Sequence, residues 1–435
     1  MRADLRPVGG NLRAASMAAA AALLWTAPAH AQTATVAAAP DPAERDDIAL
    51  TVQERQTLRD RTFGTTIGAV HVQPSASVDL AYNSNVFAAP IASGDAILTA
   101  RVAITGDFEL RRHSGGVNAE IERDTYARLS SEDATQARVA ARDTIKLPSD
   151  IELSARASFG ALVEPRSSTG APVGAGRPVR YNVVDGAVDV SRRGGRFVVA
   201  LGAQYSAYDY HDTIGAGGAV VDQEIRDFHY AEVRGRVGYD LGGPQVFVAA
   251  DRHASSYRRP QPGTGFDRDT QGWQATLGLS SEITTLLRGT LSAGYLHEHF
   301  DLDTAATVSA LAFNAALDWL PTPITTLHFG ASRRLENGAS IDASGYLASR
   351  LNLRGDHELT RNLLLDLGAS YENAAFRSID RDDDLLAITG GARLQAVGGL
   401  SFRLNGTYQQ RRSRGAARGF DFNQTVASGG VTYRF

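Results

Sequence analysis

A short run of two histidines around a glutamate is the part of this chain whose residue types could hold a metal ion. His297, Glu298 and His299 follow one another directly. Because side chains alternate along a strand, the two histidines would share one face and Glu298 would point away from them. A zinc site needs at least three protein ligands, and no third ligand is evident nearby. We therefore interpret the run as an interfacial or loop-base pair of histidines and expect no metal.

A second candidate is the acidic run from Asp380 to Asp384, which contains one arginine. The run lacks the regularly spaced ligands of a calcium loop, so a solvated acidic loop is the preferred interpretation. The chain contains no cysteine, which excludes thiol catalysis and cysteine-based zinc sites. Serine, histidine and aspartate occur at no spacing that distinguishes a catalytic set from background. The sequence predicts neither an enzyme nor a bound cofactor.

Other charged residues occupy the polar face of segments in which polar and apolar residues alternate. The residues expected to line an interior face carry both signs, and they are Arg101, Arg138, Arg142, Arg156, Arg234, Arg236, Arg403, Glu120, Glu122, Glu152, Glu232 and Asp366. The interpretation that we prefer is a wall of cross-strand ion pairs that stiffens a water-filled interior. The alternative is a transverse field that orients polar or charged solutes.

The alternating segments that would position these charges recur along most of the chain. Residues 76–82 are typical, with Ala76, Val78, Leu80 and Tyr82 on one face and polar residues between them. Such segments run to about ten residues or more, which is the length that a tilted strand needs to cross a bilayer. Short turns alternate with longer polar connections, and this predicts about 18 antiparallel strands, an even number as in bacterial barrels. The fold class expected is an all-β, transmembrane, up-and-down barrel with short periplasmic turns and longer extracellular loops.

The last strand has the same alternation, with Val431, Tyr433 and Phe435 on one face. This ending resembles the C-terminal signature of bacterial outer-membrane proteins, in which the barrel-assembly machinery reads a final Phe. The resemblance implies that Tyr433 and Phe435 form an insertion signal. The same strand is expected to close the barrel by pairing with the first strand, because an open edge in lipid leaves backbone groups unsatisfied.

The start of the chain has the pattern of a secretory leader. Residues 1–31 combine basic residues, an apolar run and an Ala-His-Ala cleavage site. Removing them deletes three Arg and one Asp, so the formal charge goes from −4 to −6, which excludes a broadly basic nucleic-acid binder. Residues 32–69 are expected to be a flexible periplasmic segment with one short helix within 46–61, or else a loosely ordered lead-in or plug edge. The barrel would occupy residues 70–435.

The stretch from Gln73 to Phe87 carries a resemblance to a known family. Pro74, Tyr82, Asn85, Val86 and Phe87 stand as in a "Pro … Tyr-x-x-Asn-Val-Phe" pattern. This opening strand resembles that of the Putative beta-barrel porin 2 family of bacterial outer-membrane proteins. The resemblance implies an outer-membrane barrel of a Gram-negative cell, without assigned catalytic residues, and an association of some members with exopolysaccharide export.

Three functions remain open from the sequence. The first is a diffusion channel for small polar solutes, because barrels of about 16–18 strands leave an aqueous lumen. The second, motivated by the family resemblance, is a conduit for surface polysaccharide, with a polysaccharide-export apparatus as partner and with Tyr126, Tyr208 and Tyr230 as candidate inward aromatics. The third is a structural or adhesive barrel that acts through its extracellular loops. Each of them implies outer-membrane lipids, lipopolysaccharide and the barrel-assembly machinery as partners.

Overall fold

The computed structural model describes residues 50–172, 175–215, 217–260, 268–284, 286–301, 307–337, 345–377 and 379–435. The predicted leader and residues 32–49 lie outside this range. One α-helix and two 3-10 helices occur among these residues, namely α1 (Val52–Asp60), η3 (Ser130–Glu132) and η4 (Glu224–Arg226). The strands are β1 (Thr65–Ile67), β2 (Val70–Asn83), β3 (Asp95–Leu110), β4 (His113–Tyr126), β5 (Ala134–Leu147), β6 (Ile151–Val163), β7 (Arg180–Gly194), β8 (Phe197–Tyr210), β9 (Thr213–Ile214), β10 (Val220–Val221), β11 (Phe228–Asp240), β12 (Gln245–Tyr257), β13 (Thr270–Thr284), β14 (Leu287–Phe300), β15 (Val308–Thr322), β16 (Thr325–Asn337), β17 (Gly345–Thr360), β18 (Leu363–Phe376), β19 (Asp382–Gln395), β20 (Leu400–Arg414) and β21 (Phe422–Arg434).

Eighteen of these strands form a closed antiparallel barrel. Each strand from β2 to β8 and from β11 to β21 pairs with the next, and β21 returns to β2 with Val78 opposite Val431. The short strand β1 adds to β2 outside this closed set. The predicted fold class is confirmed, and so is the prediction that the last strand pairs with the first.

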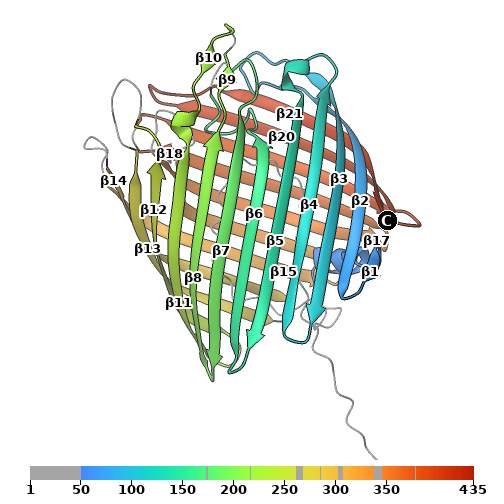
Figure 1. Cartoon of the computed structure of the whole chain (residues 1–435), viewed down its shortest axis with the longest axis vertical. Coiled ribbons are helices and arrows are strands. Elements are labelled where there is room, and N and C mark those ends of the chain that lie inside the picture. Colours follow the sequence, from blue (N-terminus) through green and yellow to red (C-terminus); the bar gives the residue numbers. More distant parts are fainter. Residues whose placement is uncertain are drawn as a thin grey trace, which may run out of the picture.

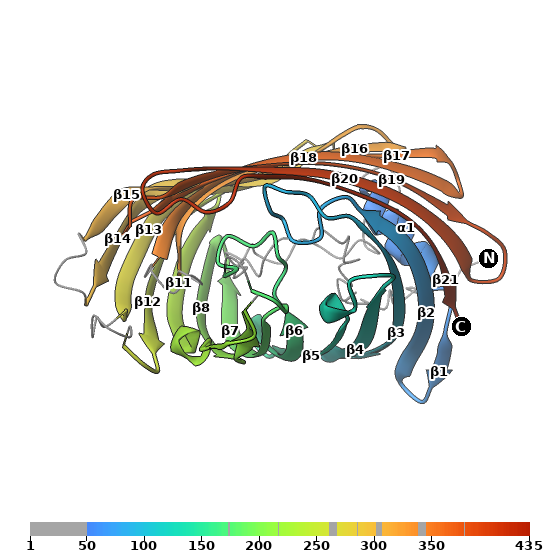
Figure 2. The same ribbon diagram turned by 90° about the horizontal axis from the view of Figure 1, so that it is seen from above.

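The two ends of the barrel differ in the length of their connections (Figure 1). At one end, which we call the turn end, two to four residues join each pair of strands; in one of these turns, Ser149 and Asp150 both adopt positive φ. At the other end, the loop end, the connections are longer, and one of them carries the β9–β10 hairpin. Seen from above, the barrel is an oval, with β4 to β12 along one long side and β15 to β20 along the other (Figure 2).

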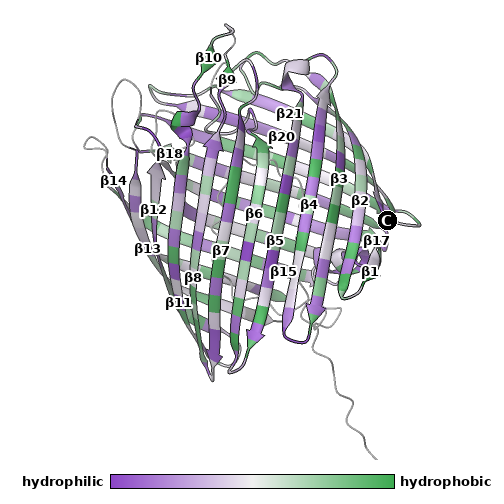
Figure 3. Cartoon of the chain, viewed as in Figure 1, coloured by the Kyte–Doolittle hydropathy of each residue, from purple (hydrophilic) through white to green (hydrophobic). Residues whose placement is uncertain are grey.

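The outer face of the barrel is apolar. Leu80, Leu277 and Leu404 are all more than 60% exposed, and apolar and polar residues alternate along the strands (Figure 3). A contiguous exposed apolar surface of this kind is not stable in water and fits the hydrocarbon of a bilayer. Within the described part of the chain, no helix combines the length and apolarity needed to cross a membrane.

The acidic run corrects one prediction. Asp382, Asp383 and Asp384 begin strand β19 instead of forming a solvated loop. Asp383 is buried and paired with Arg381 at 2.5 Å, and Arg414 contacts Asp382 at 3.2 Å and Asp384 at 2.5 Å. The arginines on either side neutralise the repulsion between the carboxylates, which is why three acids tolerate consecutive strand positions.

Candidate functional site: the barrel lumen

The interior face of the wall carries the charged residues that the sequence singled out. Arg101 is next to Val102, whose side chain is exposed on the outer face, so strand alternation turns Arg101 inward. The same alternation places all twelve predicted residues on the face opposite the exposed apolar side chains. They come from β3, β4, β5, β6, β11, β18 and β20.

Most of these charges take part in ion pairs along the wall. Arg101 contacts both Glu122 and Glu120, the latter at 3.4 Å. Further pairs join Arg142 to Asp107, Arg156 to Asp189 at 3.7 Å, Arg234 to Glu232 at 3.2 Å and to Asp189 at 2.5 Å, and Arg403 to Asp79 at 2.7 Å. Paired charges of both signs hold a water-filled interior in one geometry without giving it a strong net field.

Some of these pairs join strands that are not neighbours. Asp189 on β7 and Arg234 on β11 both lie opposite Gly202 of β8, which is the strand between them. A Cβ on Gly202 would overlap the Asp189 carboxylate, so the missing side chain is what lets the pair meet above the middle strand. Gly430 of β21 has the same position between Asp79 and Arg403.

Four of the twelve residues have other surroundings. Arg236 donates to Gln245 at 2.8 Å and its guanidinium stacks over Phe247 at 3.7 Å. Arg138 is exposed on the inner wall, opposite Glu120 in register, and Glu152 is opposite Lys146. Asp366 lies opposite Gly391 on β19.

The helix α1 lies inside the barrel at the turn end (Figure 2). It begins with a capping box, in which Thr51 Oγ1 accepts from the Glu54 N–H and Glu54 accepts from the Thr51 N–H. Glu358 of β17 is buried under the helix and accepts from Arg55, Gln56 and Arg59. These contacts attach one face of α1 to the inner wall.

Other contacts fix both ends of α1. The Val52 N–H, one of the free donors of the first helical turn, donates to Thr326 Oγ1 at 3.0 Å, and Glu54 contacts Arg288 at 2.8 Å. At the C-terminal end, Asp60 contacts Arg393 at 2.7 Å. The helix is therefore a fixed inward element that narrows the turn end of the lumen.

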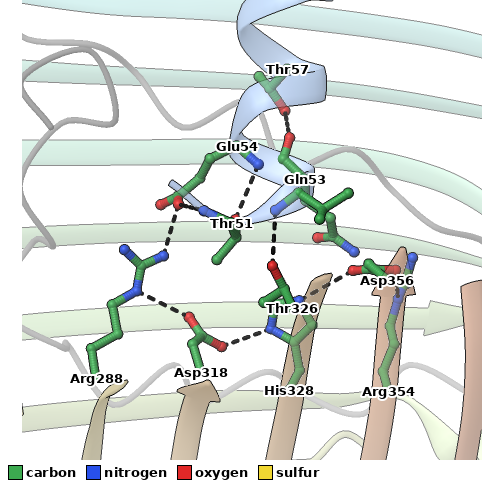
Figure 4. A network of polar contacts seen from close by, with 11 residues as sticks. Thr51, Gln53, Glu54, Thr57, Arg288, Asp318, Thr326, His328, Arg354 and Asp356 are labelled. Carbon is green, nitrogen blue, oxygen red and sulfur yellow. Dashed lines mark hydrogen bonds and ion pairs between the residues drawn. The ribbon is translucent and has the colours of Figure 1, made fainter. Parts of the chain in front are cut away.

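A network of charges lies beneath the N-terminus of α1 (Figure 4). His328 is held between Asp318 at 2.7 Å and Asp356 at 3.2 Å. Arg288 joins this network to the helix, because it contacts Asp318 at 3.3 Å as well as Glu54. Glu54, Asp318 and Asp356, the carboxylates of this network, thus each have an arginine or a histidine beside them, as a buried ionic group requires.

At the loop end, the connection between β6 and β7 reaches across the mouth of the lumen. The carbonyl groups of Ser168 and Thr169 accept from Arg411 of β20 and Arg381 before β19, at 3.3 and 3.1 Å. Since β6 and β7 face β19 and β20 across the oval, this connection spans the opening (Figure 2). We call residues 164–172 and 175–179 the crossing loop.

A buried ion pair anchors the crossing loop. Glu164 accepts two hydrogen bonds from Arg226 of η4, at 2.7 and 3.0 Å, and neither side chain is exposed by more than 4%. Burial alone lowers the pKa of Arg226, but Glu164 and the Tyr210 ring beneath the guanidinium raise that pKa above its usual value. The arginine therefore stays charged and fixes the start of the loop.

Residues 61–435 match the family model described as Putative beta-barrel porin 2. The chain belongs to this family. The resemblance of the opening strand is thereby confirmed, and the chain is a porin-like outer-membrane barrel.

Solved structures of other outer-membrane proteins resemble this barrel in outline. OccK2 (OpdF) of Pseudomonas aeruginosa is 9% identical, with 84% of this chain and 97% of that chain covered and a TM-score of 0.47. OpdK of the same organism is 10% identical, with 84% and 99% covered and a TM-score of 0.41. A mutant of its ferric enterobactin receptor PfeA is 9% identical, with 84% and 80% covered and a TM-score of 0.45. No curated protein matches the sequence.

The candidate metal run, His297 to His299, is divided between the two faces of β14. Glu298 is buried inside and accepts from His253 at 2.8 Å, whereas His297 and His299 contact Ser309 and Thr307 on the other face. Among the described residues, no group of three or more His, Asp or Glu side chains has the geometry for a metal ion.

Sequence reasoning, which left a plug edge open for the segment before the barrel, did not place the two elements that narrow the lumen. It expected a short helix near α1, but nothing in the local pattern says that this helix binds the inner wall. The crossing loop was visible as a long polar connection, yet its partners Arg381 and Arg411 lie more than 200 residues later in the chain. The spacing of Thr51 and Glu54, which fits a capping box, is a local signal that could have located the start of α1.

Proposed function

We propose that this barrel is a channel through which small polar solutes cross the outer membrane by diffusion. The observation that carries the proposal is the closed 18-strand barrel, whose inner wall is lined with charged and polar side chains while its outer face is apolar. Barrels of about 16–18 strands are wide enough for an aqueous path. The turn end would face the periplasm and the loop end the exterior, as in other bacterial barrels.

The proposed path through the lumen is narrowed by the crossing loop at the loop end and by α1 at the turn end. On this proposal, solute enters past the crossing loop, follows the ion-paired wall and leaves beside α1. Because most wall charges are paired, we expect the channel to discriminate weakly between small cations and anions.

The aromatic residues do not favour the polysaccharide conduit. Tyr208 and Tyr230 face inward, but both belong to a buried cluster with Tyr181, Tyr210 and Phe228 at the loop end. A sugar chain cannot stack on rings that other side chains cover. The adhesive alternative has no structural feature in its favour beyond the exposed loops.

Planar-bilayer recording of the refolded chain tests the channel. Stable conductance steps are expected, whereas a silent, sealed barrel would refute the proposal.

A matched pair of variants tests whether ions pass along the inner wall. Arg156→Gln removes a lumen-facing charge that is 42% exposed and should shift the reversal potential in a salt gradient toward cations. Arg252→Gln, on the outer face of β12, should leave it unchanged.

A further inference from the structure

The wall of the barrel is interrupted between β15 and β16 at the loop end. Pairing between these strands runs up to Phe313 and Arg333 and stops there. Both strands nevertheless continue: β15 pairs with β14 as far as Val308, and β16 pairs with β17 as far as Asn337. Above Phe313, β15 and β16 are therefore not paired with each other, which is unusual in a barrel wall.

We call the interruption between β15 and β16 the seam. The side chains around the seam show how the wall is arranged. Leu335 and Leu347 are register partners on the outward face of β16 and β17, the face that also carries the exposed Leu351. Leu296 and Ala312 belong to the inward face of β14 and β15, since Tyr295 and Leu311 next to them are exposed outward. All four nevertheless pack in one apolar cluster, together with Phe300, Val308 and Ala310.

An outward face can pack against an inward face only if one part of the wall passes inside the other. The ends of β16 and β17 therefore lie inside the ends of β14 and β15, and the wall overlaps there. Apolar contact, instead of a ladder of hydrogen bonds, holds this overlap together. Such a joint can admit an acyl chain without breaking backbone pairs.

A pocket of about 340 Å³ lies at the seam. Its lining combines the apolar side chains of Val308, Ala310 and Leu311 with the hydroxyl groups of Thr307 and Ser309 and with two arginines, Arg333 and Arg377. The Nε of Arg333 is buried without a hydrogen-bond partner among the described residues. The two guanidinium groups and the two hydroxyl groups of this lining suit a phosphate, and its apolar side chains suit a hydrocarbon chain.

We propose that the seam between β15 and β16 binds a lipid of the outer leaflet through its phosphorylated headgroup, with an acyl chain against the exposed Leu311. The leaflet follows from the orientation assigned above, in which the loop end faces outward. Arg333 and Arg377 supply the charge complementarity for the headgroup. Leu311 in the lining is exposed on the outward face, so the proposed site borders the lipid-facing surface.

The test measures lipid retained by the purified full chain. The refolded barrel is mixed with vesicles of phosphatidylcholine alone or with phosphatidylglycerol added, re-extracted, and analysed by native mass spectrometry. The wild type should retain phosphatidylglycerol, and the double variant Arg333→Gln/Arg377→Gln should retain about tenfold less, as expected for the loss of charge-assisted hydrogen bonds. Arg252→Gln, an outward arginine on an intact part of the wall, should behave as the wild type.

Cross-linking of the seam, competition with inorganic phosphate and conductance provide further tests of lipid binding. Ala310 and Leu335 both pack against the apolar cluster, so a bifunctional thiol reagent that joins Ala310→Cys to Leu335→Cys should close the seam and lower retention. The same reagent on Ala315→Cys and Ala331→Cys, which are register partners below the split, should leave retention unchanged. Because the chain has no native cysteine, each cross-link is unambiguous. Equal retention by the double variant, or displacement of the lipid by inorganic phosphate alone, would overturn the assignment. The conductance of the double variant Arg333→Gln/Arg377→Gln should equal that of the wild type. A loss of lipid retention without a change in conductance then separates this proposal from the channel proposal.

Discussion

The guanidinium of Arg234 lies 2.5 Å from the carboxylate of Asp189, although the strands that carry them, β11 and β7, are separated by β8. The glycine between them, Gly202, leaves room for the two side chains to meet above the middle strand. An ion pair of this kind ties three strands together where an ordinary cross-strand pair ties two. It also gives some of the glycines of this chain a role in the wall and not only in its turns.

Replacing Gly202 by Ala should separate this pair. The added methyl group would overlap the Asp189 carboxylate and leave two partly buried charges without full compensation. We expect the free energy of unfolding to fall by about 1–3 kcal/mol, measured by urea titration of the barrel in vesicles. Gly186→Ala on β7 is the control, since a Cβ there meets nothing within 4 Å. Equal stability of the two variants would contradict the role of Gly202.

Replacing Glu358 by Gln should loosen α1. Glu358 is the common acceptor for Arg55, Gln56 and Arg59, so its charge holds two cations of the helix against the wall. We expect higher single-channel conductance, because the helix would no longer narrow the turn end, and faster proteolysis between residues 50 and 61. Glu152→Gln removes an inward carboxylate on the opposite side of the barrel and should leave proteolysis of this segment unaltered. If α1 remained protected in Glu358→Gln, the anchoring role of this residue would be wrong.

Breaking the pair between Glu164 and Arg226 should release the crossing loop. Removal of one partner leaves the other charge buried, which costs about 3–5 kcal/mol, whereas removal of both leaves no charge. We therefore expect noisy, frequently switching current from Glu164→Gln alone and steadier current from Glu164→Gln combined with Arg226→Gln. The measurement is single-channel recording with the wild type alongside. Additive defects in the double variant would show that the two residues act independently.

Replacing Phe435 by Asp should impair insertion. Tyr433 and Phe435 meet edge to face, with ring centroids 4.8 Å apart, and the Phe435 N–H donates to the Pro74 carbonyl group on β2. A carboxylate there would place a charge at the edge of the lipid-facing surface, beside the junction of β21 and β2 that closes the barrel. We expect less protein in the outer membrane and loss of the mobility shift on unboiled gels. Ile91→Asp, an exposed position in a long loop, is the comparison and should insert normally; normal insertion of Phe435→Asp would refute the prediction.

The sequence by itself determined the barrel. Alternation is a local property of a strand, so Val78 and Leu80 could be assigned to the outer face, and Arg101 and Arg403 to the inner face, without knowledge of their neighbours. Turn residues such as Pro148 and Gly242 likewise act on their own backbone. The number of strands and the pairing of β21 with β2 followed from these local signals, because lipid does not tolerate an open edge.

Only the tertiary structure decided what fills and interrupts that barrel. Arg234 meets Asp189 because the register of two strand pairs places Gly202 between them, and register is set by the whole sheet. The helix α1 binds Glu358 about 300 residues later in the chain, and no local pattern encodes such a contact. The overlap at β15 and β16 arises because Leu335, on the outward face of β16, packs against the inward face of β14 and β15. Contacts between distant residues arise only when the closed sheet brings them together, so the lumen and the seam belong to the fold and not to any stretch of the sequence.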